Sequence, residues 1–454
     1  MVAFDVNVVA IALPTISREL SSGISIVGWV ITAYTVATAS LLLQSGKLGD
    51  RYGRKRIYLS GFALFGVASA LCATSIDVYQ LLGFRALQGL AASLLTATAA
   101  PLIFESFQEN QRGTAIGVNA IAWGVGSVAG PVGGGLLISL NWRYIFYINV
   151  PVAAAAVLIG RSVIPGRFNS RNLISGNRIN LLSATMLAGT TVLTLLWLTL
   201  FDALFALVGL AVLFGLVLYE RRSTNPLLNR ELLRNRGYVY SLLALVISQV
   251  AIIGVTYIMS YYFQVVVGFE PVLTGILISP LAALLVVSAP LAGRLYDRLG
   301  SAVILLTFAS LLEGGATILL SLGVGAKAET SYILILEALL GVADSFLWTP
   351  LLSSTLRFAK PELRGIANGM TFTLAFIAFA ASIAISVAVS ASYLPQSVVS
   401  RIYLGNFTGL GNSDIALFQQ GIARALLTLG GTNFLLLPLA YLLNLLQHDV
   451  KRST

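Results

Sequence analysis

Long apolar runs alternate with short polar segments along almost the whole chain. Each run is close to the roughly 20 residues that an α-helix needs to cross the hydrocarbon core of a bilayer. Within a run, polar and apolar side chains do not alternate as they do in the strands of a membrane barrel. The pattern therefore predicts an all-α membrane protein with 14 transmembrane helices. The predicted spans are residues 1–16, 26–46, 57–76, 78–103, 113–140, 143–164, 179–200, 203–219, 238–264, 272–292, 302–323, 331–355, 365–391 and 423–446.

The first run, residues 1–16, is short for a span. It corresponds to about 24 Å of helix, against a hydrocarbon core of about 30 Å. A tilted helix in a locally thinned bilayer is one explanation. We favour the other, that the native N-terminus extends before Met1.

The composition supports a membrane protein. Hydrophobic residues make up 57% of the 454 positions and charged residues 10%, and the mean hydropathy is +0.88. A soluble domain carries about 25% charged residues, so a soluble enzyme, a disordered protein and a nucleic-acid-binding domain are excluded. The sequence has one cysteine, Cys72, and one histidine, His448, so it offers no internal disulfide, no cysteine metal cluster and no histidine catalysis within the spans. We expect no enzyme activity, no metal and no cofactor.

The distribution of Lys and Arg gives the orientation. If the N-terminus is cytoplasmic, 22 of the 28 basic residues fall in the cytoplasmic loops and the C-terminal tail, and four fall on the opposite side. This asymmetry follows the positive-inside rule, and it explains the net charge of +10 without a nucleic-acid partner. It predicts a multi-pass protein of the plasma membrane, in contact with the lipid bilayer, with both termini cytoplasmic.

Three segments recur in the same order, at sequence offsets of 247 or 252 residues. Such a repeat, with both copies in the same direction, is typical of transporters whose substrate site lies between two similar halves. It predicts a six-helix bundle over 1–164, a linker with two inserted helices over 165–236 and a second six-helix bundle over 237–454. The matching residues are Gly46, Asp50, Arg51 and Gly53 with Gly293, Asp297, Arg298 and Gly300; Arg85 and Gly89 with Glu337 and Gly341; and Arg112, Gly113 and Gly117 with Arg364, Gly365 and Gly369.

Several of these residues resemble motifs of one family. The segment from Gly46 to Arg56 resembles the loop 2–3 signature of the major facilitator superfamily, and Arg85 to Gly89, including Gln88, resembles its span-4 motif. The chain is also similar to the fourteen-span drug:proton antiporter branch, although Ala10 stands where that branch usually has asparagine. The resemblance implies the major facilitator fold. The other residues that carry it are Asp5, Ala12, Leu13 and Pro14 in span 1; Gly117, Gly126, Gly130, Pro131, Gly134 and Gly135 in span 5; and Asn141, Trp142, Arg143, Phe146, Asn149 and Pro151 at span 6.

The polar segment after span 2 predicts a cytoplasmic latch. Asp50 and Arg54 lie four residues apart, with Gly46, Arg51 and Gly53 around them. Such a pair can hold spans 2 and 3 together and dock on a helix end of the other half, since anions favour helix N-termini and cations favour C-termini. The second copy keeps Asp297 and Arg298, but Ser301 replaces the arginine, so we expect a weaker latch there. The alternative is a positive-inside signal alone.

The span-5 glycines permit close approach of a facing helix, and Pro131 is expected to kink its helix. The resemblance implies that this helix pair favours export by proton exchange. Ordinary packing of small residues is the alternative.

Five charges fall inside predicted spans and away from the span ends, where charges are costly and usually functional. A buried carboxyl whose surroundings change can bind a proton on one side and release it on the other. We expect Asp5, Glu337 and Asp344 to carry protons, with Arg85 within reach of Asp5. A static ion pair is the alternative for each, and Glu313 is either functional or structural.

The sequence therefore predicts a monomeric secondary transporter for the proton-coupled efflux of amphipathic or cationic organic compounds by alternating access. A proton-coupled transporter of one metabolite, such as an amino acid, a sugar or a siderophore, is the alternative. A membrane-embedded sensor or enzyme is disfavoured, because no catalytic motif or large soluble domain is present.

Overall fold

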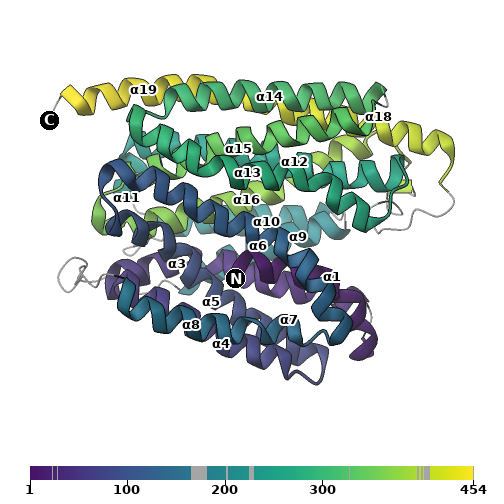
Figure 1. Cartoon of the computed structure of the whole chain (residues 1–454), viewed down its shortest axis with the longest axis horizontal. Helices are drawn as coiled ribbons and strands as arrows, with labels where there is room; N and C mark the ends of the chain where they lie inside the picture. Colours follow the sequence, from purple (N-terminus) through teal and green to yellow (C-terminus); the bar gives the residue numbers. More distant parts are fainter. Residues whose placement is uncertain are drawn as a thin grey trace. The chain divides into compact units, whose positions relative to one another are not determined.

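Every element of regular structure in the described residues is helical. The computed structural model describes residues 1–22, 24–27, 29–164, 181–200, 203–223, 230–326, 328–395, 398–399, 402 and 410–452 (Figure 1). Most of the predicted linker before the inserted helices, including Arg167, Arg171 and Arg178, lies outside these residues.

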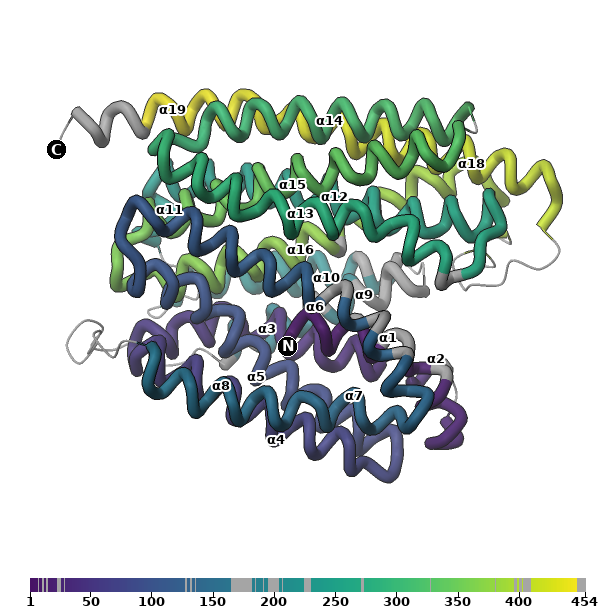
Figure 2. The backbone as a smooth tube through the Cα atoms, in the orientation of Figure 1, coloured from purple at the N-terminus to yellow at the C-terminus, as the bar shows by residue number. Residues whose placement is uncertain are grey.

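The helices follow the predicted apolar runs closely, as the colour gradient of Figure 2 allows the reader to trace. Residues 1–164 form α1 (Val2–Glu19), α2 (Ile24–Val27), α3 (Trp29–Tyr52), α4 (Arg54–Ala73), α5 (Val78–Ser106), η1 (Glu109–Gln111), α6 (Arg112–Leu140), α7 (Tyr144–Tyr147) and α8 (Asn149–Val163). The later elements are α9 (Leu181–Leu200), α10 (Ala203–Arg222), α11 (Arg230–Arg234), α12 (Arg236–Tyr261), the π-helix η2 (Tyr262–Val266), α13 (Pro271–Leu299), α14 (Val303–Ala326), α15 (Thr330–Phe358), η3 (Pro361–Leu363), α16 (Arg364–Ala391), α18 (Asn412–Asn433) and α19 (Leu436–Arg452).

Two predicted spans are present as single candidate spans, Tyr144–Val163 and Asn412–Leu446, each with a short break in its helix. The span at 143–164 is broken into α7 and α8, and the span at 423–446 begins at Asn412 and is broken between α18 and α19. Pro151 and Pro438 explain the breaks. A proline cannot donate to the carbonyl four residues before it, and its ring clashes with that carbonyl, which here belongs to Tyr147 or to Phe434.

The polar segment after the second span is also not the loop that was expected. α3 continues through Asp50 to Tyr52, and α4 begins at Arg54. Gly53, the residue between them, has a φ of 96°, in the region that glycine adopts without steric cost. Asp50 therefore lies in the last turn of a helix, and Arg54 in the first turn of the next.

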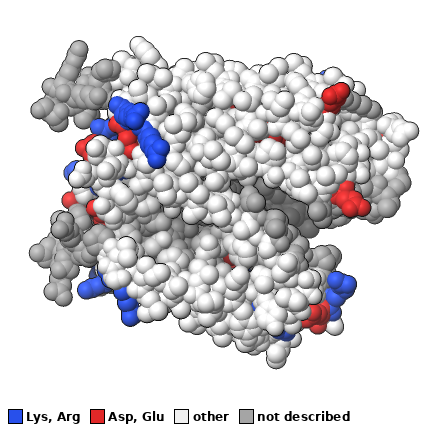
Figure 3. All heavy atoms as spheres, in the orientation of Figure 1, with Lys and Arg blue, Asp and Glu red and all other residues white. Residues whose placement is uncertain are grey.

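Nine helices in the described part of the chain are long and apolar enough to cross a membrane. Many of their large apolar side chains point outward: Val67, Leu158 and Val287 are 56%, 67% and 72% exposed. Figure 3 shows that the charged atoms visible on one face gather toward the ends of the helices, with uncharged atoms between them. This is the surface of a protein solvated by lipid, and the full set of fourteen spans stays a prediction.

The chain forms two compact units, each of which includes a short segment from a distant part of the sequence. The first unit contains Met1–Arg112, Ala122–Val239 and Thr355–Leu374, and the second contains Gly113–Ile121, Tyr240–Ser354 and Ala375–Thr454. In the first unit α5 packs against α3 and α4, α8 packs against α4, and the α9–α10 hairpin packs against α3 through α9. In the second unit α18 and α19 pack against α14. Each unit has its own buried apolar core, around Val8, Trp142 and Phe146 in the first and around Val255, Phe263 and Phe418 in the second.

Candidate functional site

A buried ion pair lies at the centre of the first unit. Arg85 of α5 donates through Nη1 to Oδ2 of Asp5 of α1 at 2.5 Å, and both side chains are 0% exposed. Gln88, one turn further along α5, donates to Oδ1 of Asp5 at 2.9 Å and accepts from Nη1 of Arg85 at 2.5 Å. The structure thus brings together three residues that the sequence singled out.

Further residues contribute to this network. Asn149 donates to Oδ1 of Asp5 at 3.3 Å, and Ser69 accepts from Gln88 at 2.7 Å. The backbone carbonyl of Val30 accepts from Nε of Arg85, and the ring of Tyr34 lies 4.3 Å from the centre of the guanidinium, a cation–π distance. Sequence reasoning assigned none of them a role. Asn149 could have been found, because it is a polar residue in a quoted motif at the start of an apolar run.

In this arrangement Arg85 neutralises the negative charge of Asp5, and a proton could neutralise it instead. Within a buried ion pair each charge offsets the other, whereas either charge alone is strongly destabilising. A proton on Asp5 would remove its attraction to Arg85. The pair can therefore couple the protonation of Asp5 to the position of α1 against α5.

The described residues of the second unit include three buried carboxyl groups. Glu313 of α14 and Glu337 of α15 are 0% exposed, and Asp344 of α15 is 8% exposed. Among the described residues, neither carboxylate oxygen of Glu337 has a hydrogen-bond partner, nor does Oδ1 of Asp344. None of the three is in an ion pair within the described chain.

Asp344 interacts electrostatically with Glu313 and has Gln249 as a polar neighbour. Oε1 of Glu313 accepts from Asn433 of α18 at 3.2 Å. The Asp344 carboxyl of α15 and the Glu313 carboxyl of α14 therefore influence each other electrostatically. A buried carboxyl without a cationic partner is tolerated when it carries a proton, so this unit can hold protons where the first unit holds an ion pair.

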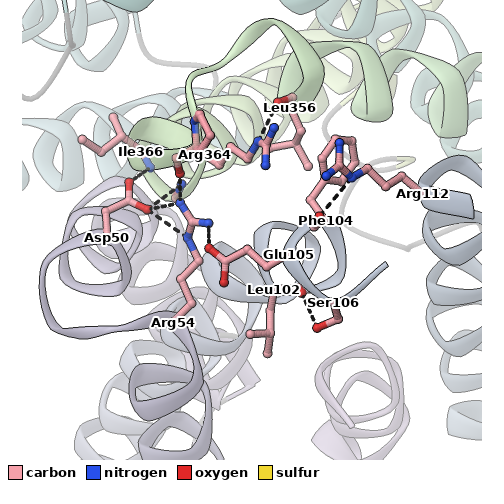
Figure 4. A network of polar contacts seen from close by, with 12 residues as sticks. Asp50, Arg54, Leu102, Phe104, Glu105, Ser106, Arg112, Leu356, Arg364 and Ile366 are labelled. Atoms are coloured by element: carbon pink, nitrogen blue, oxygen red, sulfur yellow. Dashed lines mark hydrogen bonds and ion pairs between the residues drawn. The ribbon is translucent and has the colours of Figure 1, made fainter. Parts of the chain in front are cut away.

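The first latch joins the end of α3 to the start of α16 (Figure 4). Asp50 accepts through Oδ1 from the backbone N–H of Gly365 at 2.9 Å and through Oδ2 from that of Ile366 at 2.8 Å. These donors belong to the first turn of α16, where free N–H groups and the helix dipole favour an anion. The predicted docking of this carboxylate on a helix end is thus present within the first unit.

Arg54 forms an ion pair with the same carboxylate. It donates to Oδ1 of Asp50 through Nε at 3.0 Å and through Nη2 at 2.6 Å, and it also contacts Glu105 and the carbonyl of Pro361. Burial raises the pKa of Asp50, which lies beyond the end of its predicted span, while Arg54 and the two amide donors oppose that rise. Sequence reasoning missed Glu105, which lies at the end of a span with nothing in its spacing to link it to Arg54.

The second latch has the same geometry in the second unit. Asp297 of α13 accepts from the backbone N–H of Gly113 and from both N–H and Oγ1 of Thr114, each at 2.8 Å. These positions are related to those of the first latch by the repeat offsets of 247 and 252. Ser301 replaces the arginine, and its hydroxyl accepts from Val303 at 3.4 Å.

The other predicted residues near the latches do not bind the aspartates directly. Arg51 is exposed and lies 5.1 Å from the ring of Tyr52, and Arg298 is exposed. Arg112 and Arg364 occupy repeat-related positions, and their Nε atoms donate to the carbonyls of Phe104 and Leu356 at 3.0 and 3.1 Å. Each arginine therefore closes the turn before the helix whose N-terminus receives an aspartate.

Glycines let the backbones meet at the latches. A Cβ at Gly46 would overlap the carbonyl of Gly365, and a Cβ at Gly293 would overlap that of Gly113. In the span-5 motif, Gly117 faces the carbonyl of Ala289. Close approach of helices is what small residues permit.

The C-terminal half of the span-5 motif packs against α1. A Cβ at Gly126 would crowd Ala3 and Phe4, and one at Gly134 would overlap the side chain of Val8. These three residues flank Asp5, so the glycines position the helix that carries the buried carboxylate. Gly130, Pro131 and Gly135 lie in the same helix, α6, which is continuous from Arg112 to Leu140.

We expect Gly89→Ala to destabilise the protein by about 1–3 kcal/mol, because overpacking a close contact has a cost of this order. Its Cβ would overlap the carbonyl of Tyr34, whose ring contacts the guanidinium of Arg85. Gly83→Ala is the matched control on α5, since its Cβ would meet open space. Thermal unfolding of the purified protein measures both, and an equal effect of the two substitutions would contradict the close-approach argument.

Comparison with known proteins identifies the family. A family model described as Major Facilitator Superfamily matches residues 1–383. An uncharacterized MFS-type transporter of Mycobacterium tuberculosis is 33% identical over 381 residues, which are 82% of this chain, and the chain spans 65% of that relative's length. The tetracenomycin C resistance and export protein of Streptomyces glaucescens is 32% identical, with 82% of this chain and 70% of its own covered. The solved structure of the proton:xylose symporter XylE superposes with a TM-score of 0.64 at 14% identity, over 97% of this chain and 92% of its own, and supports the fold.

Proposed function

Because the chain belongs to the major facilitator superfamily, we propose that its buried charges and its two latches carry out proton-coupled efflux of amphipathic or cationic organic compounds by alternating access. The family confirms the expectation of a multi-pass membrane transporter of small molecules rather than an enzyme. The observation that carries the proposal is the contrast between a paired aspartate in one unit and unpaired carboxyl groups in the other.

Asp5 is the proposed proton carrier of the first unit. While Arg85 is paired with it, the carboxylate is stable in a buried site. Protonation removes that stabilisation and frees α1 to move against α5. Loss of the proton restores the pair, so one proton can drive one change of conformation.

Glu337 and Asp344 are the proposed carriers of the second unit. Their unpartnered oxygens offer a place for a proton or for the positive charge of a cargo molecule. A cation and a proton that compete for the same carboxylates give antiport directly, because binding of one displaces the other. This reasoning favours cationic cargo, and the tetracenomycin C export protein, as a relative, favours export.

The latches are the proposed gate. Gly46, Asp50, Arg51, Gly53 and Arg54 form its first half, and Asp297 and Arg298 belong to its second half. Bonds from a carboxylate to backbone N–H groups at a helix end break and re-form without chemical change. The gate can therefore open and close once in every transport cycle.

The remaining features of the proposal come from the sequence pattern. Fourteen spans form six-helix bundles over 1–164 and 237–454, with two inserted helices in 165–236. The protein acts as a monomer in the plasma membrane with both termini cytoplasmic, and it binds no cofactor and no nucleic acid.

Everted membrane vesicles test this function. An acidified interior is expected to drive accumulation of a cationic dye such as ethidium, and nigericin, which collapses the pH gradient, is expected to abolish it. Accumulation that survives nigericin would contradict proton coupling. Accumulation of one amino acid, sugar or siderophore, with no response to cationic dyes, would favour the single-metabolite transporter instead.

A further inference from the structure

A buried electrostatic interaction links the inserted helices to α3, the helix of the first latch, against which α9 packs. Lys47 of α3 is 6% exposed and is attracted to the Glu220 carboxylate of α10, which is also 6% exposed. Ser183 at the start of α9 donates to Oε1 of Glu220 at 2.5 Å. One buried charge on α3 is therefore matched by a group that both inserted helices hold in place.

The position of Lys47 in the sequence makes this contact relevant to the latch. Gly46 and Asp50 are four residues apart and share the side of α3 that meets α16. Lys47 is one residue further along than Gly46, about 100° around the helix. One turn of α3 thus meets α16 on one side and the inserted pair on another.

The interaction between Lys47 and Glu220 stabilises the present arrangement of α3 and α10. Burial lowers the pKa of Lys47 to about 8, and the Glu220 carboxylate opposes this decrease. An ammonium group buried without its partner would be strongly unfavourable. Movement of α3 away from α10 would therefore cost free energy unless water reached both groups.

We propose that Glu220 is a positioning residue for the gate: the inserted pair α9–α10 holds the end of α3 through Lys47, so that Asp50 meets the start of α16. This inference rests on the proposed role of the first latch as a gate. It assigns the inserted helices a task in transport, that of setting how readily the latch opens.

Thiol labelling tests the inference without any cargo. Ala97 of α5 is 0% exposed, and its carbonyl accepts from Asn368 of α16 at 2.9 Å, so Ala97→Cys reports when α16 leaves this site. In that background, Glu220→Gln is expected to raise the rate of maleimide labelling roughly 3- to 10-fold, a range that corresponds to the loss of one modest contact. Glu220→Asp, which keeps the charge, is expected to label at a rate closer to that of the parent.

Three comparisons make the result decisive. Glu109→Gln removes an exposed ion pair with Arg357 and is expected to leave labelling unchanged. Lys47→Gln combined with Glu220→Gln is expected to label no faster than the stronger single variant, since both remove one contact. Cys72 is buried, and its failure to label in the same variants with Ala97 retained shows that the fold is intact.

The outcomes separate the two proposals. If Asp50→Asn does not raise labelling of the Ala97→Cys protein, the latch is not a gate and the proposed function loses that part. If Asp50→Asn raises labelling but Glu220→Gln does not, or if Glu109→Gln raises it equally, the role assigned to the inserted helices is wrong.

Discussion

Replacing Arg85 with methionine is expected to destabilise the protein by about 3–5 kcal/mol, the usual effect of removing one partner of a buried ion pair, and to abolish proton-driven efflux. Asp5 is 0% exposed and would keep only the amide donors of Gln88 and Asn149. It would then be stable chiefly in its protonated form, and a carboxyl that never releases its proton cannot couple transport to a gradient. Unfolding of the purified variant and dye accumulation in everted vesicles measure the two effects.

A double substitution separates the two effects. Asp5→Asn with Arg85→Met removes both charges, so it is expected to recover much of the stability that Arg85→Met loses, without recovering efflux. A static ion pair that serves stability alone predicts something different, namely that efflux returns together with stability. Normal efflux by Arg85→Met would end the proposed role of the pair.

Asp344→Asn is expected to reduce proton-driven efflux by at least about tenfold, since removal of an acid–base group commonly has effects of this size or larger. Asp344 has an oxygen without a hydrogen-bond partner in the described chain, and asparagine cannot bind a proton there. The variant is still expected to exchange cargo across the membrane when no pH gradient is present. Dye accumulation and cargo counterflow, measured side by side, distinguish loss of coupling from loss of transport.

Glu313→Gln is the matched comparison for that substitution. Glutamine keeps the oxygen that accepts from Asn433, so the contact between α14 and α18 is retained and a modest effect is expected. Glu337→Gln is expected to resemble Asp344→Asn. Full coupling in Glu337→Gln and Asp5→Asn, both of which lack a proposed carrier, would show that protons move elsewhere.

The helices and the latch residues could be predicted because each depends on local pattern. Apolar runs of span length specify helices in lipid, and the repeat relates Asp50 to Asp297 and Gly365 to Gly113. An anion next to a helix N-terminus is a general preference, so residue type and spacing predicted that Asp50 docks on a helix end and that Asp297 forms a weaker latch, but they did not identify Gly365 or Gly113 as the donors.

The breaks in the helices could not be predicted in the same way. Pro101 and Pro350 lie inside continuous helices, whereas Pro151 and Pro438 lie just after breaks. A proline weakens one backbone bond wherever it occurs, and packing around it decides whether the helix continues. The sequence shows the proline but not its neighbours.

The partners of the buried charges could also not be predicted from the sequence. Tyr34 and Ser69 meet Arg85 and Gln88 through the packing of α3 and α4 on α5. Lys47 and Glu220 come together across more than 170 positions. Such contacts depend on how helices pack, which the amino-acid sequence alone does not show.

The two aspartates that dock on helix ends differ in whether their backbone donors are synthesised before or after them. Asp50 precedes Gly365 by 315 positions, whereas Asp297 follows Gly113 by 184. Asp50 therefore emerges long before its backbone donors, and Arg54, one turn away, can neutralise it as soon as the two helices form. Asp297 emerges when its donors already exist, and Ser301 stands at the position that corresponds to Arg54. The two copies of the motif thus differ both in their order of synthesis and in the residue one turn after the aspartate.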